Sequence, residues 1–126
     1  MVHPEKITML PNGVKVLNTT PHPITFKTPA EVIVTIPPCG FVLNANIIET
    51  PVKGPIEGVD FVTASFVPNK AGSNFIDEVP NDVLIVGSLM ASQAYPERVV
   101  SLVPHDGKHR RSELKRMSID KFTIFR

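Results

Sequence analysis

The polar segment at residues 18–23, Asn-Thr-Thr-Pro-His-Pro, holds side chains that are well suited to binding a ligand. Prolines on both sides of His22 restrict the backbone, and the following proline favours an extended conformation at the histidine. Such a rigid corner presents amide, hydroxyl and imidazole groups in fixed positions, so Asn18, Thr20 and His22 are candidate ligand-binding residues. The alternative interpretation is a turn that sets strand register, with His22 bonded to the backbone.

Four further residues could bind an anion. Arginine offers phosphate a planar pair of donors, which makes Arg98, Arg110 and Arg111 candidates for an anion site. Arg98 begins a predicted strand, whereas Arg110 and Arg111 lie in a basic tail. Ser88 follows an apolar strand and adds a hydroxyl. With the polar corner, these residues predict a site for a small anionic ligand, a nucleotide included.

Residues 105–126 form a basic C-terminal segment with seven basic and three acidic side chains, although the formal charge of the whole chain is only +1. A basic segment of this kind binds anionic ligands, nucleic acid or acidic partners. The alternative is a solvated loop and edge strand. The chain has no Trp and only one Tyr, so few aromatic rings are available to stack on nucleic-acid bases.

The sequence does not indicate an enzyme. Cys39 and His22 could form a thiol–imidazole pair, but the sequence shows no orienting group and nothing that would lower a thiol pKa. The four histidines are dispersed, and no glycine-rich phosphate loop occurs. We therefore expect no catalytic residue, no metal site and no cofactor.

Length and composition predict a single soluble domain over residues 1–126. Hydrophobic residues make up 42% of the chain and charged residues 20%, which is not the composition of a disordered protein. Cys39 is the single cysteine, so no disulfide can form within the chain. No apolar run approaches the roughly 18 residues that a membrane span needs. We expect a cytoplasmic protein with no membrane partner.

The elements that must position these residues are short. Thirteen prolines punctuate the chain and work against long helices. Alternating or continuous apolar runs predict about eight strands: Val14–Leu17, Ile24–Lys27, Glu31–Ile36, Phe41–Ile48, Asp60–Val67, Asp82–Val86, Arg98–Val103 and Phe122–Phe125. Leu89–Tyr95 is the best helix candidate, Ser112–Met117 could add one helical turn, and Asn69–Asn74 is predicted to be a loop. The expected fold is mostly β, a small antiparallel barrel or sandwich with one or two short helices.

Three segments together carry a family resemblance. They are Val-Leu-Asn-Thr-Thr-Pro-His-Pro-Ile at 16–24, Ile-Pro-Pro-Cys-Gly at 36–40, and the run 83–91 followed by 98–104. Their order resembles a family of small, largely uncharacterised phage, prophage and bacterial proteins with an Asn-Leu-Thr-Pro-His-like N-terminal motif. The chain departs from the family pattern at Thr19, usually Leu, at Cys39, usually Ser, and at Gly87 beside Ser88. The resemblance implies a phage or bacterial origin and a compact β-rich fold.

These observations leave three hypotheses for function. The first is a non-catalytic phage-type accessory protein in the host cytoplasm, which binds a small anionic ligand or a host protein and counters bacterial immunity. The second is a structural β-domain that assembles with itself, as a homo-oligomer, or with a larger phage complex, since short strands leave edges for pairing. The third is a basic module that binds nucleic acid through residues 105–126.

Overall fold

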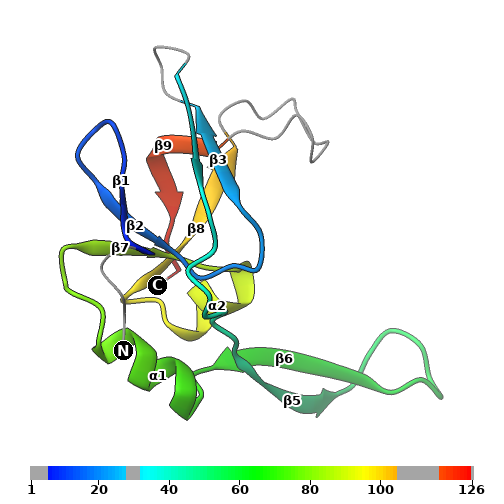
Figure 1. Cartoon of the computed structure of the whole chain (residues 1–126). Coiled ribbons are helices and arrows are strands. Elements are labelled where there is room, and N and C mark those ends of the chain that lie inside the picture. The colour runs from blue at the N-terminus through cyan, green and yellow to red at the C-terminus, as the bar shows by residue number, and fades with distance from the viewer. Residues whose placement is uncertain (1–5, 28–31, 105–116, 126) are drawn as a thin grey trace.

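The segments between prolines are mostly too short for anything but strands. The computed structural model describes residues 6–27, 32–104 and 117–125. Within these residues it contains nine strands and two helices (Figure 1). In chain order they are β1 (Thr8–Met9), β2 (Lys15–Asn18), β3 (Ile24–Lys27), β4 (Ile33–Ile36), β5 (Asn46–Val52), β6 (Phe61–Val67), α1 (Lys70–Asp77), β7 (Val83–Val86), α2 (Leu89–Ala94), β8 (Val99–Pro104) and β9 (Met117–Thr123).

Seven strands form one mixed sheet in the order β1-β2-β7-β8-β9-β3-β4. The mostly-β prediction is confirmed, but β2, β7 and β8 run parallel, as do β3 and β9, where antiparallel pairing was expected. β1 and β4 lie at open edges, so the sheet is not a closed barrel. The parallel centre has a physical reason: β7 is apolar throughout, and a strand of that kind needs cover on both faces.

Two apolar clusters lie on opposite faces of this sheet. Leu17 and Ile85 belong to the first cluster, and their chain neighbours Val16 and Val86 belong to the second. This alternation follows from the two-residue period of a strand. Both helices cover the first face; their buried apolar residues there are Ile76, Ala91 and Ala94. The expected burial of β7 on both faces is therefore confirmed.

Helix α2 is predicted correctly, whereas α1 is not. Ser88 caps α2 by accepting a hydrogen bond from the Ala91 amide at 3.1 Å. The segment at 69–74 was predicted to be a loop because of Gly72, but it begins α1, with Asn69 as the cap. Gly72 is required there for close packing, since a Cβ at this position would overlap the Tyr95 hydroxyl. Tertiary packing thus overrides a weak local signal.

Strands β5 and β6 form a separate two-stranded sheet, which projects away from the rest of the molecule as a hairpin (Figure 1). We call residues 46–67 the arm. The strand expected over 41–48 is replaced by irregular chain up to Ala45, and β5 begins only at Asn46. At the base of the arm, Phe66 packs against the first cluster. Beyond the base, every residue of β5 is exposed.

Candidate functional site

The polar corner after β2 is built around the side chain of Asn18, which is completely buried. Its Nδ2 donates to the carbonyl oxygens of His22 at 2.9 Å and Ile36 at 3.2 Å. Its Oδ1 accepts from the Thr20 amide at 2.9 Å and from the Thr20 hydroxyl at 2.6 Å. Every polar atom of Asn18 is therefore bonded within the chain, and little of the corner is available to a ligand.

Thr19 and Thr20 extend this network. The Thr19 hydroxyl donates to the Val86 carbonyl at 2.7 Å, which ties the end of β2 to the end of β7. The Thr20 hydroxyl also lies 3.0 Å from the His22 carbonyl. The imidazole of His22 is exposed and lies outside this network of bonds. The bonds of Asn18, Thr19 and Thr20 are those of a turn that holds strand ends together, but they come from these residues and not from the His22 imidazole of the alternative interpretation.

Carboxyl ends of adjacent parallel strands are common ligand sites in open sheets. Here β2 and β7 end side by side, Asn18 opposite Val86, but another segment covers this edge. The Cys39 amide donates to the Asn18 carbonyl at 2.8 Å, and the Leu43 amide donates to the Thr19 carbonyl at 3.1 Å. The backbone of residues 37–43 thus takes the hydrogen-bonding positions that a ligand would need.

Ser88 lies at this same end of the sheet, where its hydroxyl caps α2. Gly87 lets the chain pass close to its neighbours, because a Cβ there would lie 2.8 Å from Val99 Cγ1 and 3.2 Å from Thr19 Oγ1. The structure therefore brings Ser88 near Asn18 and Thr20, as a shared site requires. The Ser88 hydroxyl is already an acceptor in the cap.

Arg98 is at the other end of β7. Its guanidinium donates to the carbonyl oxygens of Val79 at 3.2 Å and Pro80 at 3.3 Å, and both of these residues precede β7. Arg98 lies beside Leu84 in the sheet, because its neighbour Val99 pairs with Ile85. Ser88 comes four residues after Leu84, so the rise of a strand places it about 13 Å further along. The structure does not bring Arg98 together with Ser88 and the polar corner, and it uses the guanidinium to satisfy carbonyl groups at a turn.

Two shallow hollows flank Arg98, with volumes of about 370 and 320 Å³. Glu97 lines both hollows, and Asp77 or Asp82 adds a second carboxylate to each. These negative charges oppose an anionic ligand beside Arg98. Arg110 and Arg111 lie outside the described residues, as does most of the basic segment 105–126. Within the described ranges, no group of three or more His, Cys, Asp or Glu side chains could hold a metal ion.

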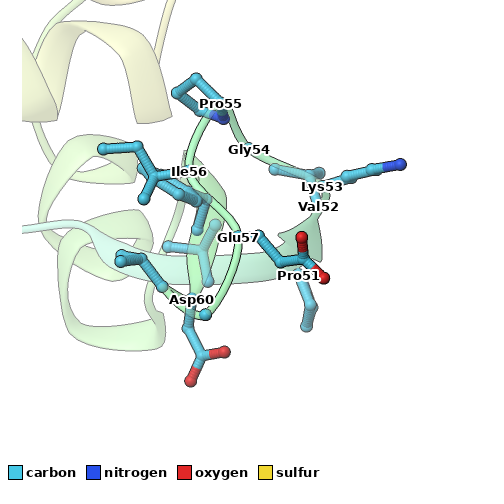
Figure 2. A pocket seen from close by; sticks show the side chains of 12 residues that line it. Pro51, Val52, Lys53, Gly54, Pro55, Ile56, Glu57 and Asp60 are labelled. Atoms are coloured by element: carbon cyan, nitrogen blue, oxygen red, sulfur yellow. The ribbon is translucent and has the colours of Figure 1, made fainter.

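The arm carries the features that sequence reasoning missed. Six of its apolar side chains are exposed, each by about two-fifths or more: Ile47, Ile48, Val52, Ile56, Val59 and Val62. At the tip, residues 51–62 surround a hollow of about 740 Å³ (Figure 2). Phe61 packs so closely on Gly54 that a Cβ there would overlap its ring, and Gly58 turns the chain at a φ of +85°. Lys53 and Asp60 point outward from this tip (Figure 2).

The two edges of the arm differ in their capacity to pair with another strand. Pro51 is paired with Val62, and a proline fits inside a ladder only where its missing N–H would face away from the partner strand. Pairs alternate in type along an antiparallel ladder. The outward-facing backbone groups on β5 are therefore those of Ile47, Glu49 and Pro51; on β6 they are those of Val62, Ala64 and Phe66.

This assignment leaves β5 protected and β6 open. Proline and charged residues are the devices that blunt a sheet edge, and β5 has both at outward-facing positions, in Pro51 and Glu49. β6, with the sequence Phe-Val-Thr-Ala-Ser-Phe-Val, has neither. Among the described residues, β6 pairs with β5 alone. Its second edge therefore has no strand partner and can accept another strand along its exposed part, whereas at the base Phe66 packs against the first cluster and β6 contacts α2.

The arm is also acidic. It contains Glu49, Glu57 and Asp60 against Lys53, a net charge of −2, and the remaining chain carries +3. Binding to nucleic acid depends on several cations placed against phosphates, and the arm offers one, Lys53, against three carboxylates. The same charge opposes contact with anionic lipid.

Comparison with known proteins adds no further assignment, since no family model, curated protein or solved structure matches the chain. Among the described residues, no helix is both long enough and apolar enough to span a membrane.

Proposed function

We propose that this protein is a non-catalytic accessory protein that acts by joining another protein chain, and that the arm is its binding element. The observation that carries the proposal is a projecting hairpin with exposed apolar side chains and one unprotected edge. An isolated two-stranded hairpin is marginal in water, and a third strand or an apolar partner surface stabilises it. Phage or bacterial origin and action in the cytoplasm belong to the same proposal and rest on the sequence motifs.

Protein binding accounts for the arm better than the other hypotheses do. A small-anion site would need several free donors in one place. Asn18 uses both of its donors inside the chain, one guanidinium nitrogen of Arg98 is bonded to the Val79 and Pro80 carbonyls, and carboxylates line the hollows beside Arg98. A nucleic-acid site on the arm is opposed by its net charge of −2. Exposed apolar side chains on a projecting hairpin are a feature that a protein partner covers.

A shortened arm tests this function. Replacing residues 51–62 by Asn-Gly joins Thr50 to Thr63 through a two-residue hairpin turn and removes the tip. The main sheet lies elsewhere, so we expect unchanged thermal unfolding of the body. We expect loss of assembly, measured as the sedimentation mass of the purified protein and as the set of proteins retained by a tagged chain in its host cell.

The matched control is Met9→Lys, which alters an exposed apolar side chain on β1, an edge strand of the seven-stranded sheet to which the arm does not belong. It should leave both measurements unchanged. If the shortened arm keeps the mass and the bound proteins of the wild type, the arm is not the binding element and the proposed function is wrong.

A further inference from the structure

The sequence of β6 is nearly palindromic about its central residue. Reading outward from Ala64, Thr63 mirrors Ser65, Val62 mirrors Phe66, and Phe61 mirrors Val67. One mirrored pair joins two hydroxyl residues, and the other two each join an aromatic residue with a β-branched one. These are pairs that stabilise neighbouring antiparallel strands.

We infer that the unprotected edge of β6 pairs with β6 of a second copy of this chain, antiparallel and around a twofold axis at Ala64. This inference rests on the proposed function and names the partner. The result is a four-stranded sheet in the order β5-β6-β6-β5. Its outer edges are the two β5 strands, where Pro51 and Glu49 prevent further addition. Self-pairing therefore closes at two chains.

The backbone groups are in the correct phase for this pairing. Val62, Ala64 and Phe66 direct their N–H and C=O groups away from β5, as deduced from the position of Pro51. With the axis at Ala64, Ala64 meets its own copy, and Val62 meets Phe66 of the second copy. Each such pair exchanges two hydrogen bonds, so about six backbone hydrogen bonds form.

Antiparallel pairing also determines where the apolar tip of each arm lies on the other copy. It brings the tip of the second copy to the base of the first arm, where β6 contacts α2. The exposed residues of α2 include Leu89 and Met90, at 60% and 48%. Ile56 and Val59 at the tip of the second copy supply apolar surface for this end.

Charge is compatible with the same arrangement. The strand β6 has no charged residue, so no like charges meet at the pairing edge. The two β5 strands lie three strand spacings apart, about 14 Å, which exceeds the Debye length of about 8 Å at physiological salt.

Disulfide trapping provides the first test. In a Cys39→Ser background, Ala64→Cys places two sulfurs at the axis, where paired Cα atoms are about 5.5 Å apart, within disulfide range. Mild oxidation should convert most of this variant to a covalent dimer. Val62→Cys on the same face is the control: its counterpart in the second copy lies four residues along the strand, about 14 Å away, and should not cross-link.

Proline substitution provides the second test. Ala64→Pro removes an outward-facing N–H from β6, and Glu49→Pro removes the one directly opposite on β5, so each leaves the inner ladder intact. Ala64→Pro should raise the dimer Kd about 100-fold or more, through two lost hydrogen bonds and the steric bulk of the ring. Glu49→Pro should leave it within about threefold. Sedimentation measures both, and circular dichroism checks that both variants fold.

A monomeric wild-type chain, or a dimer that Ala64→Pro does not weaken, overturns the self-pairing. The proposed function fails separately. If the wild type is a monomer but the shortened arm loses a foreign protein, only the identity of the partner is wrong. If the shortened arm loses nothing, both proposals are wrong.

Discussion

Replacing Asn18 by alanine distinguishes a structural corner from a ligand site. The side chain is completely buried and takes part in four hydrogen bonds, with the carbonyl groups of Ile36 and His22 and with the amide and hydroxyl of Thr20. Alanine removes all four. If the corner serves the fold, the main effect is on the free energy of unfolding, in the absence of any ligand.

The size of the loss in unfolding free energy depends on which groups are left without a hydrogen-bond partner. The bond to the Ile36 carbonyl is buried, and leaving a buried acceptor unsatisfied costs about 1–3 kcal/mol. The other three bonds are partly exposed, so water replaces them and each contributes about 0.5 kcal/mol. We therefore expect Asn18→Ala to lower the free energy of unfolding by about 2.5–4.5 kcal/mol.

Urea unfolding followed by circular dichroism measures this loss, provided that the denaturant slope is unchanged. His22→Ala is the matched control: the imidazole is exposed, and its loss should stay within about 0.5 kcal/mol of the wild type. If Asn18→Ala costs less than about 1 kcal/mol, the hydrogen bonds do not hold the corner together, and the structural interpretation is wrong.

Three further predictions concern other parts of the fold. Gly87→Ala should lower the free energy of unfolding by about 1–3 kcal/mol, since the new Cβ meets the buried side chain of Val99; thermal unfolding of the variant measures this. Arg98→Ala should cost about 1 kcal/mol and leave the affinity for inorganic phosphate unchanged by calorimetry; a large loss of phosphate binding would instead support an anion site. Lys15 lies 2.9 Å from Asp82 and lowers the pKa of that carboxyl group. The stabilisation by this ion pair is therefore present above the ordinary carboxyl pKa and is lost as the pH falls. Lys15→Met should raise the pKa of Asp82, which NMR titration measures.

The strands were predictable where local pattern and burial agree. β3 coincides with its predicted range, and the apolar run that predicted a doubly buried strand is β7, at the centre of the sheet. The parallel pairing of β2 and β7 could not be predicted, because five elements separate these strands in the chain and local periodicity carries no information on direction. The α1 helix was missed because Gly72 resembles a loop residue until the position of Tyr95 is known.

The sequence predicted which polar residues lie at the candidate site, but not that their polar groups are bonded within the chain. The sequence identified Asn18, Thr20 and Ser88 as polar residues at strand ends, and the structure does place them at one end of the sheet. The sequence did not show that their polar atoms are all bonded within the chain. Most of the partners are local, at Thr20, His22 and Ala91, but the Ile36 carbonyl that completes the bonding of Asn18 lies 18 residues away. The exposure of the arm was equally hidden: alternating runs on either side of residues 53–60 indicate a hairpin, but not whether a core covers it.

Our proposal that the arm is the binding element rests on how the polar side chains elsewhere in the protein are bonded. Those with chemical potential, at the polar corner and at Arg98, satisfy backbone groups and hold the sheet together. The accessible hydrogen-bonding capacity of the arm is instead in the main chain of β6, whose side chains carry no reactive group. A strand edge tolerates any sequence of suitable shape and β-propensity, provided that proline and charge stay away from the outward-facing positions. In the proposed pairing of β6, binding specificity depends on symmetry and edge protection rather than on a sequence motif.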